Sequence, residues 1–455
     1  MILRKLKANE HVLTRPLWER VFDEDTTEFL DYYYTSKTED NEIYVIEKDG
    51  EIHSMLHLNP YVLQIGKKEE GSRYIVGVAT DRMYRGQGQM TELLRKAVRD
   101  MYTKKLPFTF LMPADEKIYY PHDFRFVYAA EQWEAFMANG EVPSLDAILH
   151  SGNGKRILLR PALASDCKKI AAFAEHILEE KYQIYVKRDW LYYETLLREQ
   201  KSQKGGILLA ETDDEIKGIL VFDEEKDFSV REPLVEPGYE DIFEKGGLIL
   251  KKQEKKKPMI MARILHVESL LSCMACDEDT EFQFILVDPV IRENNKIFSI
   301  KGNKEHLVVR TKPIAKGKSD GIQMISVDAL TTILFGYKSL EKVEEEEQEK
   351  FSAEFKEKFW AGIQEGKRVE TVAADLGINP EILGKNRLNG LRSMIRQEVK
   401  AGKGFRDLDT YRAYHEGCTS PEAKIYYLEQ QLAYKDQEIE FLKKIVSLGK
   451  EEKQR

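Results

Sequence analysis

Apolar and polar positions in residues 1–150 mix strand-like and helix-like runs. The stretch NEIYVIEKDGEIHSMLHL places two β-rich runs on either side of Asp49-Gly50. Asp-Gly is a preferred dipeptide of tight turns, so this stretch predicts a β-hairpin. A further strand ends at residues 76–78, and residues 91–101 (TELLRKAVRDM) have the spacing of an amphipathic helix.

A similar layout recurs later in the chain. In ILLAETDDEIKGILVF, the pair Asp213-Asp214 falls where Asp49-Gly50 falls in the first hairpin. Each hairpin follows a long helical region, and that region is opened by a similar short strand. We interpret the pattern as a tandem duplication of one α/β unit; the alternative is that any two α/β halves share such patterns.

The rest of the chain has a different character. Residues 259–340 alternate short apolar runs with two helical stretches, which predicts a small α+β unit, and KVEEEEQEK then forms a charged linker. In the tail, VAADLGINPEIL has the Ala and Gly spacing of a helix-turn-helix. Residues 425–446 follow a 3-4 heptad spacing, which suits either a short coiled coil or a helix packed on its neighbours.

Composition limits the class of protein. A chain of 455 residues with 42% apolar and 33% charged residues predicts a protein of roughly two to four domains with real cores. It contains no apolar run of the ~20 residues that a membrane span needs, no secretory signal is recognisable, and four cysteines make no disulfide framework. We therefore expect a soluble, cytoplasmic protein that does not associate with membranes.

Charge changes this picture only locally. The net charge of -9 argues against wholesale nucleic-acid binding. The segment from Lys367 to Arg412, however, contains ten Lys and Arg and six Asp and Glu. Its net charge is therefore 10 − 6 = +4. Cys273 and Cys276 form a CxxC with no second pair, which favours a core or surface pair over zinc or redox chemistry, and we predict no metal site.

A loop rich in Arg and Gly carries the strongest chemical signal. It lies between the strand that ends at residues 76–78 and the helix at residues 91–101, and it reads Arg85, Gly86, Gln87, Gly88, Gln89, Met90. Glycines let backbone N–H groups turn inward, a helix N-terminus favours negative charge, and an arginine adds a charge-assisted contact. The pattern indicates a phosphate or pyrophosphate site, the alternative being a basic surface turn. The Walker ending is absent, and Thr91 stands in place of the third Gly of the dinucleotide fingerprint.

Three stretches, VGVATDRMYRGQGQMTELL, LMPADEKIYYPHDFRF and PMIMARILHVESLL, together resemble the Eis-type (enhanced intracellular survival) branch of GNAT acetyltransferases. The resemblance implies an α/β (α+β) chain of tandem GNAT domains, the second degenerate, then a sterol-carrier-like α+β domain and an all-α tail. The tail resembles the helix-turn-helix and leucine-rich end of insertion-sequence transposase proteins, without the tryptophan often found after their recognition helix. The expected boundaries are 1–150, 151–258 and 259–340 for the three domains, 341–350 for the acidic linker, 351–415 for the helix-turn-helix-like segment and 420–450 for the coiled-coil-like helix.

The same resemblance implies a site for acetyl-CoA. Val76, Gly77 and Val78 would contact the acetyl-pantetheine arm through their backbone, and the loop from Arg85 to Met90 would cradle the pyrophosphate. Met90 departs from the Gly or Ala usual in the wider family. Tyr119, in the run EKIY, would protonate the departing thiolate; a phenol of pKa ~10 can donate that proton when it is held within hydrogen-bond reach.

The implied activity is acetyl transfer to primary amines, either aminoglycoside-like polyamines or protein lysines. Acidic side chains would attract these cations; the candidates are Asp23, Glu24, Asp115 and Glu116. In Eis-type enzymes the base is the terminal carboxylate, but this sequence continues past residue 340 to GKEEKQR, so water, Asp115 or Glu116 stay open as bases. The alternative is a CoA-binding regulator with little catalysis, which binds DNA through residues 351–415. A homo-oligomer, by resemblance a hexamer, is also expected.

Overall fold

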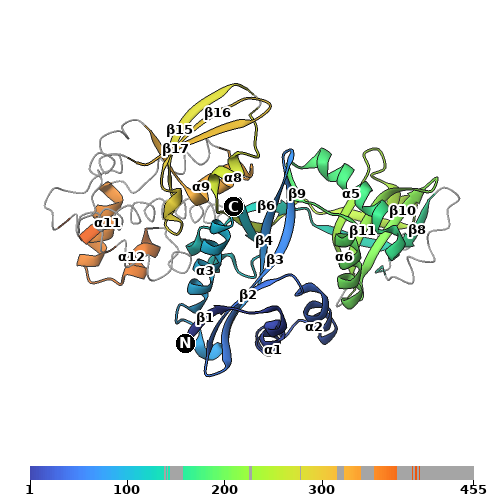
Figure 1. The fold of residues 1–455 in the computed structure, drawn as a ribbon, viewed down its shortest axis with the longest axis horizontal. Coiled ribbons are helices and arrows are strands. Elements are labelled where there is room, and N and C mark those ends of the chain that lie inside the picture. Colours follow the sequence, from blue (N-terminus) through green and yellow to red (C-terminus); the bar gives the residue numbers. More distant parts are fainter. Residues whose placement is uncertain are drawn as a thin grey trace. The chain divides into compact units, whose positions relative to one another are not determined.

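The computed structural model describes residues 1–137, 140, 142–143, 157–224, 228–276, 278–314, 322–339 and 353–376, with single residues 392, 395, 396 and 399. The chain divides into two compact units, one of Met1–Met112 with Tyr128–Ile260 and one of Pro113–Val127 with Met261–Arg455. Each contains helices and strands, which confirms the predicted α/β class (Figure 1). None of the described helices combines the length and apolar character that crossing a membrane requires.

The first half of the first unit is a twisted sheet with helices. Strands β1 to β4 pair antiparallel in sequence order, and β5 adds to β4 in parallel. Apolar side chains of α1 and α2, led by Leu17, Trp18 and Leu30, are buried against this sheet. The elements are β1 (Ile2–Lys5), α1 (Arg15–Val21), α2 (Thr27–Tyr32), β2 (Glu42–Lys48), β3 (Glu51–Ile65), β4 (Lys68–Thr80), α3 (Gln89–Thr103) and β5 (Phe108–Leu111).

The second half of this unit repeats the layout of the first. Its four-stranded sheet has the order β12-β11-β10-β8, so β8, β10, β11 and β12 pair as β1 to β4 do. The elements from here to the end of the unit are β7 (Trp133–Met137), β8 (Leu158–Pro161), α5 (Cys167–Lys181), β9 (Ile184–Val186), α6 (Trp190–Ser202), β10 (Gly206–Thr212), β11 (Glu215–Asp223), β12 (Ser229–Val235), α7 (Ile242–Lys245) and β13 (Leu248–Lys252). The residues of β6 (Arg125–Ala130) and β14 (Lys257–Ile264) are divided between the two units, with Arg125 and Arg263 in the second.

The repeat extends to individual side chains. Both predicted hairpins form, and their two turn residues have positive φ in each copy. Arg4 of β1 pairs with Glu10 at 2.9 Å and with Glu47 at 3.0 Å. Arg160 of β8 makes the corresponding pairs with Asp166 and Glu211, both at 2.7 Å. A shared ion-pair motif at matching places supports the tandem duplication inferred from the sequence.

The two halves of the first unit are joined directly. Strand β9 pairs antiparallel with the end of β3, where Leu63 faces Val186. Helix α6 of the second half packs against α2 of the first, and the hydroxyl of Tyr32 donates to a carboxylate oxygen of Glu199 at 3.2 Å. Side chains from both halves therefore meet along this seam.

The second unit contains its own sheet and a helical part. The sheet has the order β17-β16-β15-β18, with β15 and β18 parallel. In the helical part α11 and α12 pack so closely that a Cβ on Gly362 would lie 2.9 Å from Val372. The predicted turn at Gly377, the helix from Pro380 and the heptads of 425–446 lie outside the described residues. The elements are α8 (Val267–Leu271), β15 (Thr280–Val287), β16 (Ile297–Gly302), β17 (Leu307–Lys312), β18 (Gln323–Ser326), α9 (Val327–Leu334), α11 (Ala353–Gln364) and α12 (Val369–Asp375).

Candidate active site

The predicted anion-binding loop is an exposed turn at the start of a long helix. It follows β4, and α3 begins at Gln89, after Gly88 as the N-cap. Gly86 and Gly88 have φ of +76° and +80°, a left-handed conformation that L side chains rarely adopt. No atom lies within 4 Å of a Cβ built on either glycine, so backbone conformation rather than packing requires glycine here. The first N–H groups of α3 have no carbonyl partner within the helix, which suits them to an anion.

Side chains of this loop divide into two groups. Those of Arg85 and Gln87 are exposed, and Arg85 Nε donates to the Thr80 carbonyl at 3.1 Å. The side chain of Gln89 is buried and accepts a hydrogen bond from Ser54 at 2.7 Å, while Met90 is half-buried. Gln89 can thus contribute only its backbone to a ligand, whereas Arg85 can contribute its guanidinium.

Strand β4 is irregular where the acetyl-pantetheine arm is expected. Met55 faces Ala79 and His57 faces Val76, so β4 carries one more residue than β3 between these pairs and forms a β-bulge. The bulge contains Gly77, whose φ is +58°. A Cβ on Gly77 would lie 2.4 Å from the ring of Trp18, so the backbone and the ring exclude any larger residue.

The bulge also lies where β4 is no longer paired with β5. The two parallel strands pair at Arg73 with Thr109 and at Tyr74 with Phe110. Beyond Tyr74, the described register between them ends, while β4 continues to Thr80. Among the described residues, residues 76–78 have no pairing with β5.

Tyr119 belongs to the second unit. It lies between two short 3-10 turns, Glu116–Ile118 and Tyr120–His122, rather than in an extended stretch. Its side chain is buried, with 8% of its surface exposed, and its ring meets that of Phe124 edge-on at 6.0 Å. The same turn carries Asp115, which is exposed and accepts from the Lys117 N–H at 3.0 Å, and the half-buried Glu116.

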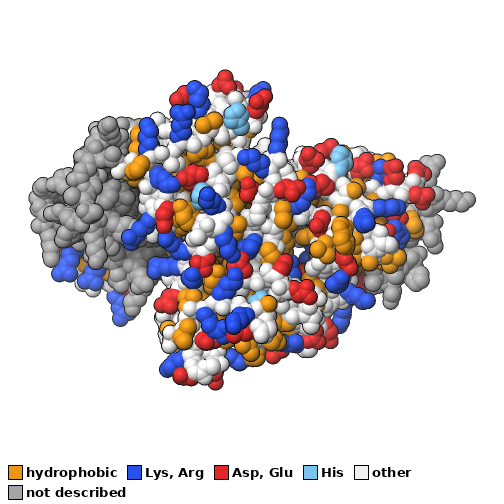
Figure 2. Space-filling model, in the orientation of Figure 1, with side chains coloured by type: hydrophobic (Ala, Val, Ile, Leu, Met, Phe, Trp, Pro, Cys, Tyr) orange, Lys and Arg blue, Asp and Glu red, His pale blue; other side chains and the backbone are white. Residues whose placement is uncertain are grey.

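Asp23 and Glu24 lie in the first unit, between α1 and α2, and both are exposed. The neighbouring Asp25 is the residue engaged with the core, since Trp18 Nε1 donates to its carboxylate at 2.7 Å. Basic and acidic side chains are interspersed on the described part of the face drawn in Figure 2, so charge recognition there depends on local groups.

Sequence reasoning missed a cluster of aromatic side chains at the seam between the two halves of the first unit. The rings of Tyr61, Tyr74 and Phe110 contact one another in edge-on and tilted arrangements, with centroids 5.3 to 6.2 Å apart. The ammonium of Lys37 lies 4.8 Å from the Tyr61 ring, a cation–π contact. Tyr74 precedes Val76 by two residues on β4, so the cluster leads toward the bulge.

Glu199 adds a carboxylate to this seam. It comes from α6, accepts the hydrogen bond of Tyr32, and is half-buried. Burial raises its pKa above the ordinary value, although Lys37 and the Tyr32 hydrogen bond act in the opposite direction. No local signal in α6 marks this glutamate, because its partners come from sequence positions more than a hundred residues away.

His57 was also passed over in the sequence. Its ring is fully buried, Nδ1 lies 3.1 Å from the Tyr33 hydroxyl, and Nε2 has no hydrogen-bond partner among the residues that the structure describes. Burial, with a smaller contribution from His11, lowers the pKa of His57 to about 3. The imidazole is therefore neutral at physiological pH, on the β3 residue that faces Val76.

Comparison with known proteins gives two family matches and several structures of the same fold. Residues 3–127 match the family model of the acetyltransferase (GNAT) domain, and residues 343–452 match that of a transposon related HTH domain protein. No curated protein matches the chain.

Solved structures share the fold at low sequence identity. A conserved protein from Enterococcus faecalis, described as a probable N-acyltransferase, superposes with a TM-score of 0.58 at 14% identity, over 75% of this chain and 92% of its own. A GCN5-related N-acetyltransferase from Anabaena variabilis gives 0.58 at 12% identity, also over 75% and 92%. Eis1 from Mycobacterium abscessus gives 0.53 at 11% identity, over 76% and 92%.

These matches define the class of the protein. Residues 3–127 match a GNAT acetyltransferase domain, about three quarters of the chain shares its fold with solved GNAT-type structures that include Eis1, and residues 343–452 match a transposon-related helix-turn-helix domain. GNAT domains normally use acetyl-CoA.

Proposed function

We propose that the protein is an acetyl-CoA-dependent N-acetyltransferase that transfers the acetyl group to primary amines of polyamines, aminoglycoside-like compounds or lysine side chains. The observation that carries the proposal is the exposed loop of Arg85 to Gly88, with two left-handed glycines at the start of α3 and a bulge in the strand before it. We retain the expected domain boundaries, including a sterol-carrier-like domain at residues 259–340, as part of this proposal.

In this proposal the first N–H groups of α3 and the Arg85 guanidinium hold the pyrophosphate of acetyl-CoA. The bulge at Val76 to Val78 offers backbone groups to the pantetheine arm and to the acetyl carbonyl. The positive ends of backbone dipoles near that carbonyl stabilise the negative charge that develops on its oxygen during transfer.

The chemistry is direct attack. The amine nitrogen forms a bond to the carbonyl carbon as the carbon–sulfur bond breaks, and Tyr119 donates its phenolic proton to the sulfur. The ammonium group first loses one proton, either to water or to a carboxylate such as Asp115 or Glu116, and the nitrogen loses a second proton to solvent as the amide forms. Solvent returns a proton to Tyr119. The products are an amide and free CoA.

We further propose that the seam of Tyr61, Tyr74 and Phe110 with Glu199 binds the acceptor. Ring faces and a carboxylate attract an ammonium group. The contact between Lys37 and Tyr61 supports this, since a cation already occupies one ring face. The seam also follows β4 directly toward the bulge, so an amine bound there would point toward the acetyl group.

The proposal is tested by thiol release from acetyl-CoA with spermine and kanamycin as acceptors. Arg85→Glu should raise the Kd of acetyl-CoA about tenfold or more, because it places a negative charge beside the pyrophosphate. The control Lys67→Glu reverses an exposed charge in the turn before β4 and should leave that Kd unchanged. Tyr119→Phe should lower kcat about a hundredfold with acetyl-CoA binding intact. An unchanged Kd in Arg85→Glu would show that the coenzyme site lies elsewhere.

A second function is favoured by the match of residues 343–452 to a transposon related HTH domain. We propose that this tail binds DNA. Its described part agrees with a small helical core, in which Phe359 and Ala373 are fully buried. If catalysis proves weak while both ligands bind, the protein is better described as a CoA-responsive regulator.

A further inference from the structure

The turn that carries Tyr119 is held by buried charged side chains of its own unit. At its end, Asp123 has a φ of +65°, in the left-handed region. The carbonyl of Tyr119 accepts from the His122 N–H at 2.9 Å and from the Phe124 N–H at 3.4 Å. These local bonds shape the turn, and side chains from other elements fasten it.

Two arginines bind backbone carbonyl oxygens of the residues that follow Tyr119. Arg263 of β14 donates through Nε to the His122 carbonyl at 3.2 Å. Arg125 of β6 donates through Nη1 to the Tyr120 carbonyl at 3.0 Å and to the Phe124 carbonyl at 2.9 Å. Its guanidinium also lies 5.2 Å from the centre of the Tyr120 ring. The residue after Tyr119 is thereby held at both its backbone and its ring.

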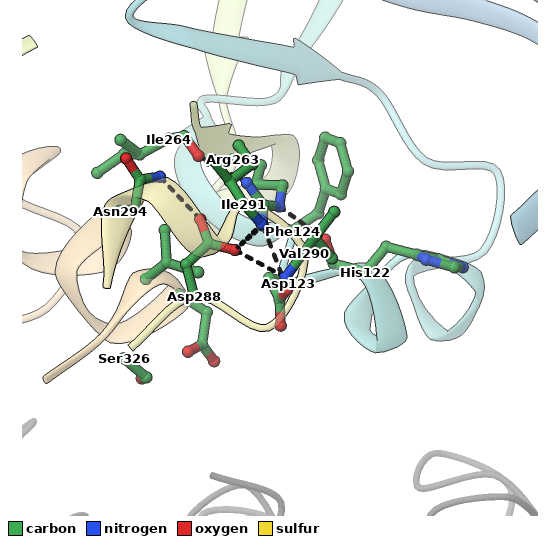
Figure 3. Close-up of polar contacts among 12 residues, drawn as sticks. His122, Asp123, Phe124, Arg263, Ile264, Asp288, Val290, Ile291, Asn294 and Ser326 are labelled. Carbon is green, nitrogen blue, oxygen red and sulfur yellow. Dashed lines mark hydrogen bonds and ion pairs between the residues drawn. The ribbon is translucent and has the colours of Figure 1, made fainter. Parts of the chain in front are cut away.

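Each arginine is in turn held by an aspartate from residues 261–339. Arg263 pairs with Asp288 at 2.7 Å, and both side chains are fully buried (Figure 3). Asp288 also accepts from the backbone of Val290 and Ile291. Arg125 pairs with Asp328 of α9 at 2.5 Å, with side chains 8% and 13% exposed.

The two buried ion pairs are better explained by a role in fixing the shape of the Tyr119 turn than by a contribution to the stability of the protein. Buried ion pairs cost desolvation energy that their attraction often fails to exceed, so well-packed apolar residues could replace them at no loss of stability. Burial even raises the pKa of Asp288, against the effect of Arg263. Apolar replacements could not bind three backbone carbonyls, whereas the planar guanidinium donates in fixed directions.

We propose that Arg125 and Arg263 are positioning residues for Tyr119. Asp328 holds Arg125, and Asp288 holds Arg263. Residues 261–339 then act as the scaffold of the catalytic turn, so the third segment is part of the catalytic machinery rather than an appended domain. This inference rests on the proposed function, in which Tyr119 protonates the leaving sulfur.

The test uses the full chain and the isosteric substitution Asp328→Asn, which removes the charge that holds Arg125. We expect kcat with acetyl-CoA and spermine to fall about tenfold or more, because small misplacements of a catalytic group are costly, while the KM for acetyl-CoA stays unchanged. Glu268→Gln is the matched control: Glu268 pairs with Lys296 at 2.5 Å in the same segment, and its loss should not change kcat. Arg125→Lys is a second variant, which keeps the positive charge but lacks the planar set of guanidinium N–H donors.

A double-mutant cycle separates positioning from general damage. If Asp328 acts through Tyr119, Asp328→Asn should change kcat less than about twofold in a Tyr119→Phe background. A loss of the same size in both backgrounds would overturn the proposal.

Hydrogen exchange gives a readout that needs no acceptor. Asp328→Asn should speed exchange in residues 113–127 and leave residues 81–92 unchanged. Unchanged exchange in residues 113–127 would overturn the positioning role even when Tyr119→Phe abolishes turnover. Full turnover in Tyr119→Phe would instead remove the acid of the proposed function, which distinguishes the two failures.

Discussion

At the scale of single residues, Gly77 is restricted to glycine by both its backbone conformation and its packing. Its φ of +58° disfavours any other residue, and a Cβ would lie 2.4 Å from Trp18, which is itself buried and packed 4.7 Å from the Tyr33 ring. Gly77→Ala should therefore cost about 1–3 kcal/mol of stability and weaken acetyl-CoA binding, because the bulge must move. Thermal unfolding with and without acetyl-CoA measures both effects.

Gly71 offers a matched control on the same strand. A Cβ on Gly71 meets only Leu106, at 3.6 Å, an ordinary contact. Gly71→Ala should leave binding unchanged and stability nearly so. Equal effects of the two substitutions would contradict a special role for the bulge.

Glu199 gives a prediction about pH at the same scale. Because its pKa is raised, the carboxylate ionises only above the usual range of a glutamate, and it then attracts an ammonium group. The KM for spermine should fall as pH rises through that raised pKa, and Glu199→Gln should raise the KM and flatten the profile. The KM for acetyl-CoA should not follow pH in this way. An unaltered acceptor KM in Glu199→Gln would exclude the seam as the acceptor site.

At the scale of elements, Glu42 of β2 ties four segments of the first half together. Lys5, Arg73 and Lys104 all bind its carboxylate, at 2.6 to 3.0 Å. Burial alone would raise the pKa of Glu42, but the hydrogen bonds from these cations outweigh burial and lower the pKa to about 2. The ionised Glu42 carboxylate thus stabilises the folded state fully at pH values above its ordinary pKa of 4.5. This stabilisation is lost as the pH falls toward 2.

Glu42→Gln should accordingly destabilise the protein at neutral pH by up to about 3 kcal/mol, since three cations would then lack their shared partner. The difference from the parent chain should shrink between pH 4.5 and 2, the window set by the two pKa values. Urea unfolding at a series of pH values measures this. Glu19→Gln, which removes one exposed pair with Arg15, should have little effect at any pH. A pH-independent difference for Glu42→Gln would contradict the assignment.

At the scale of the whole molecule, local signals predicted local structure well. Asp49-Gly50 and Asp213-Asp214 predicted both hairpins, because turn dipeptides act within a few residues. The loop before α3 was predicted for the same reason. Its exposure and its glycine conformations agree with a ligand site, though Gln89 turned out to be buried against Ser54.

The remaining features depend on distant pairs. Glu199 meets Tyr32, and Arg263 meets Asp288 and the turn of Tyr119, only in the folded chain. Neither pairing leaves a periodic or spacing signal, because the partners belong to elements that meet only after folding. A single sequence can therefore suggest the coenzyme loop, whereas the acceptor seam and the scaffold of Tyr119 require coordinates.

The helix-turn-helix tail leads to a prediction about the whole chain. Among its described residues, Arg392 and Arg396 have helical conformation and are exposed, while Ile395 is fully buried. The full chain should bind duplex DNA with an affinity that falls steeply with salt, since phosphate contacts release counterions. Reversing both charges, Arg392→Glu with Arg396→Glu, should weaken binding about tenfold or more and lessen the salt dependence.

Reversing the charges of Lys168 and Lys169, which are exposed on α5, should change neither the affinity nor its salt dependence. Equal affinity of both charge-reversed chains would show that Arg392 and Arg396 do not contact DNA. Acetyl-CoA binding, which we propose for the first unit, should be the same in all of them.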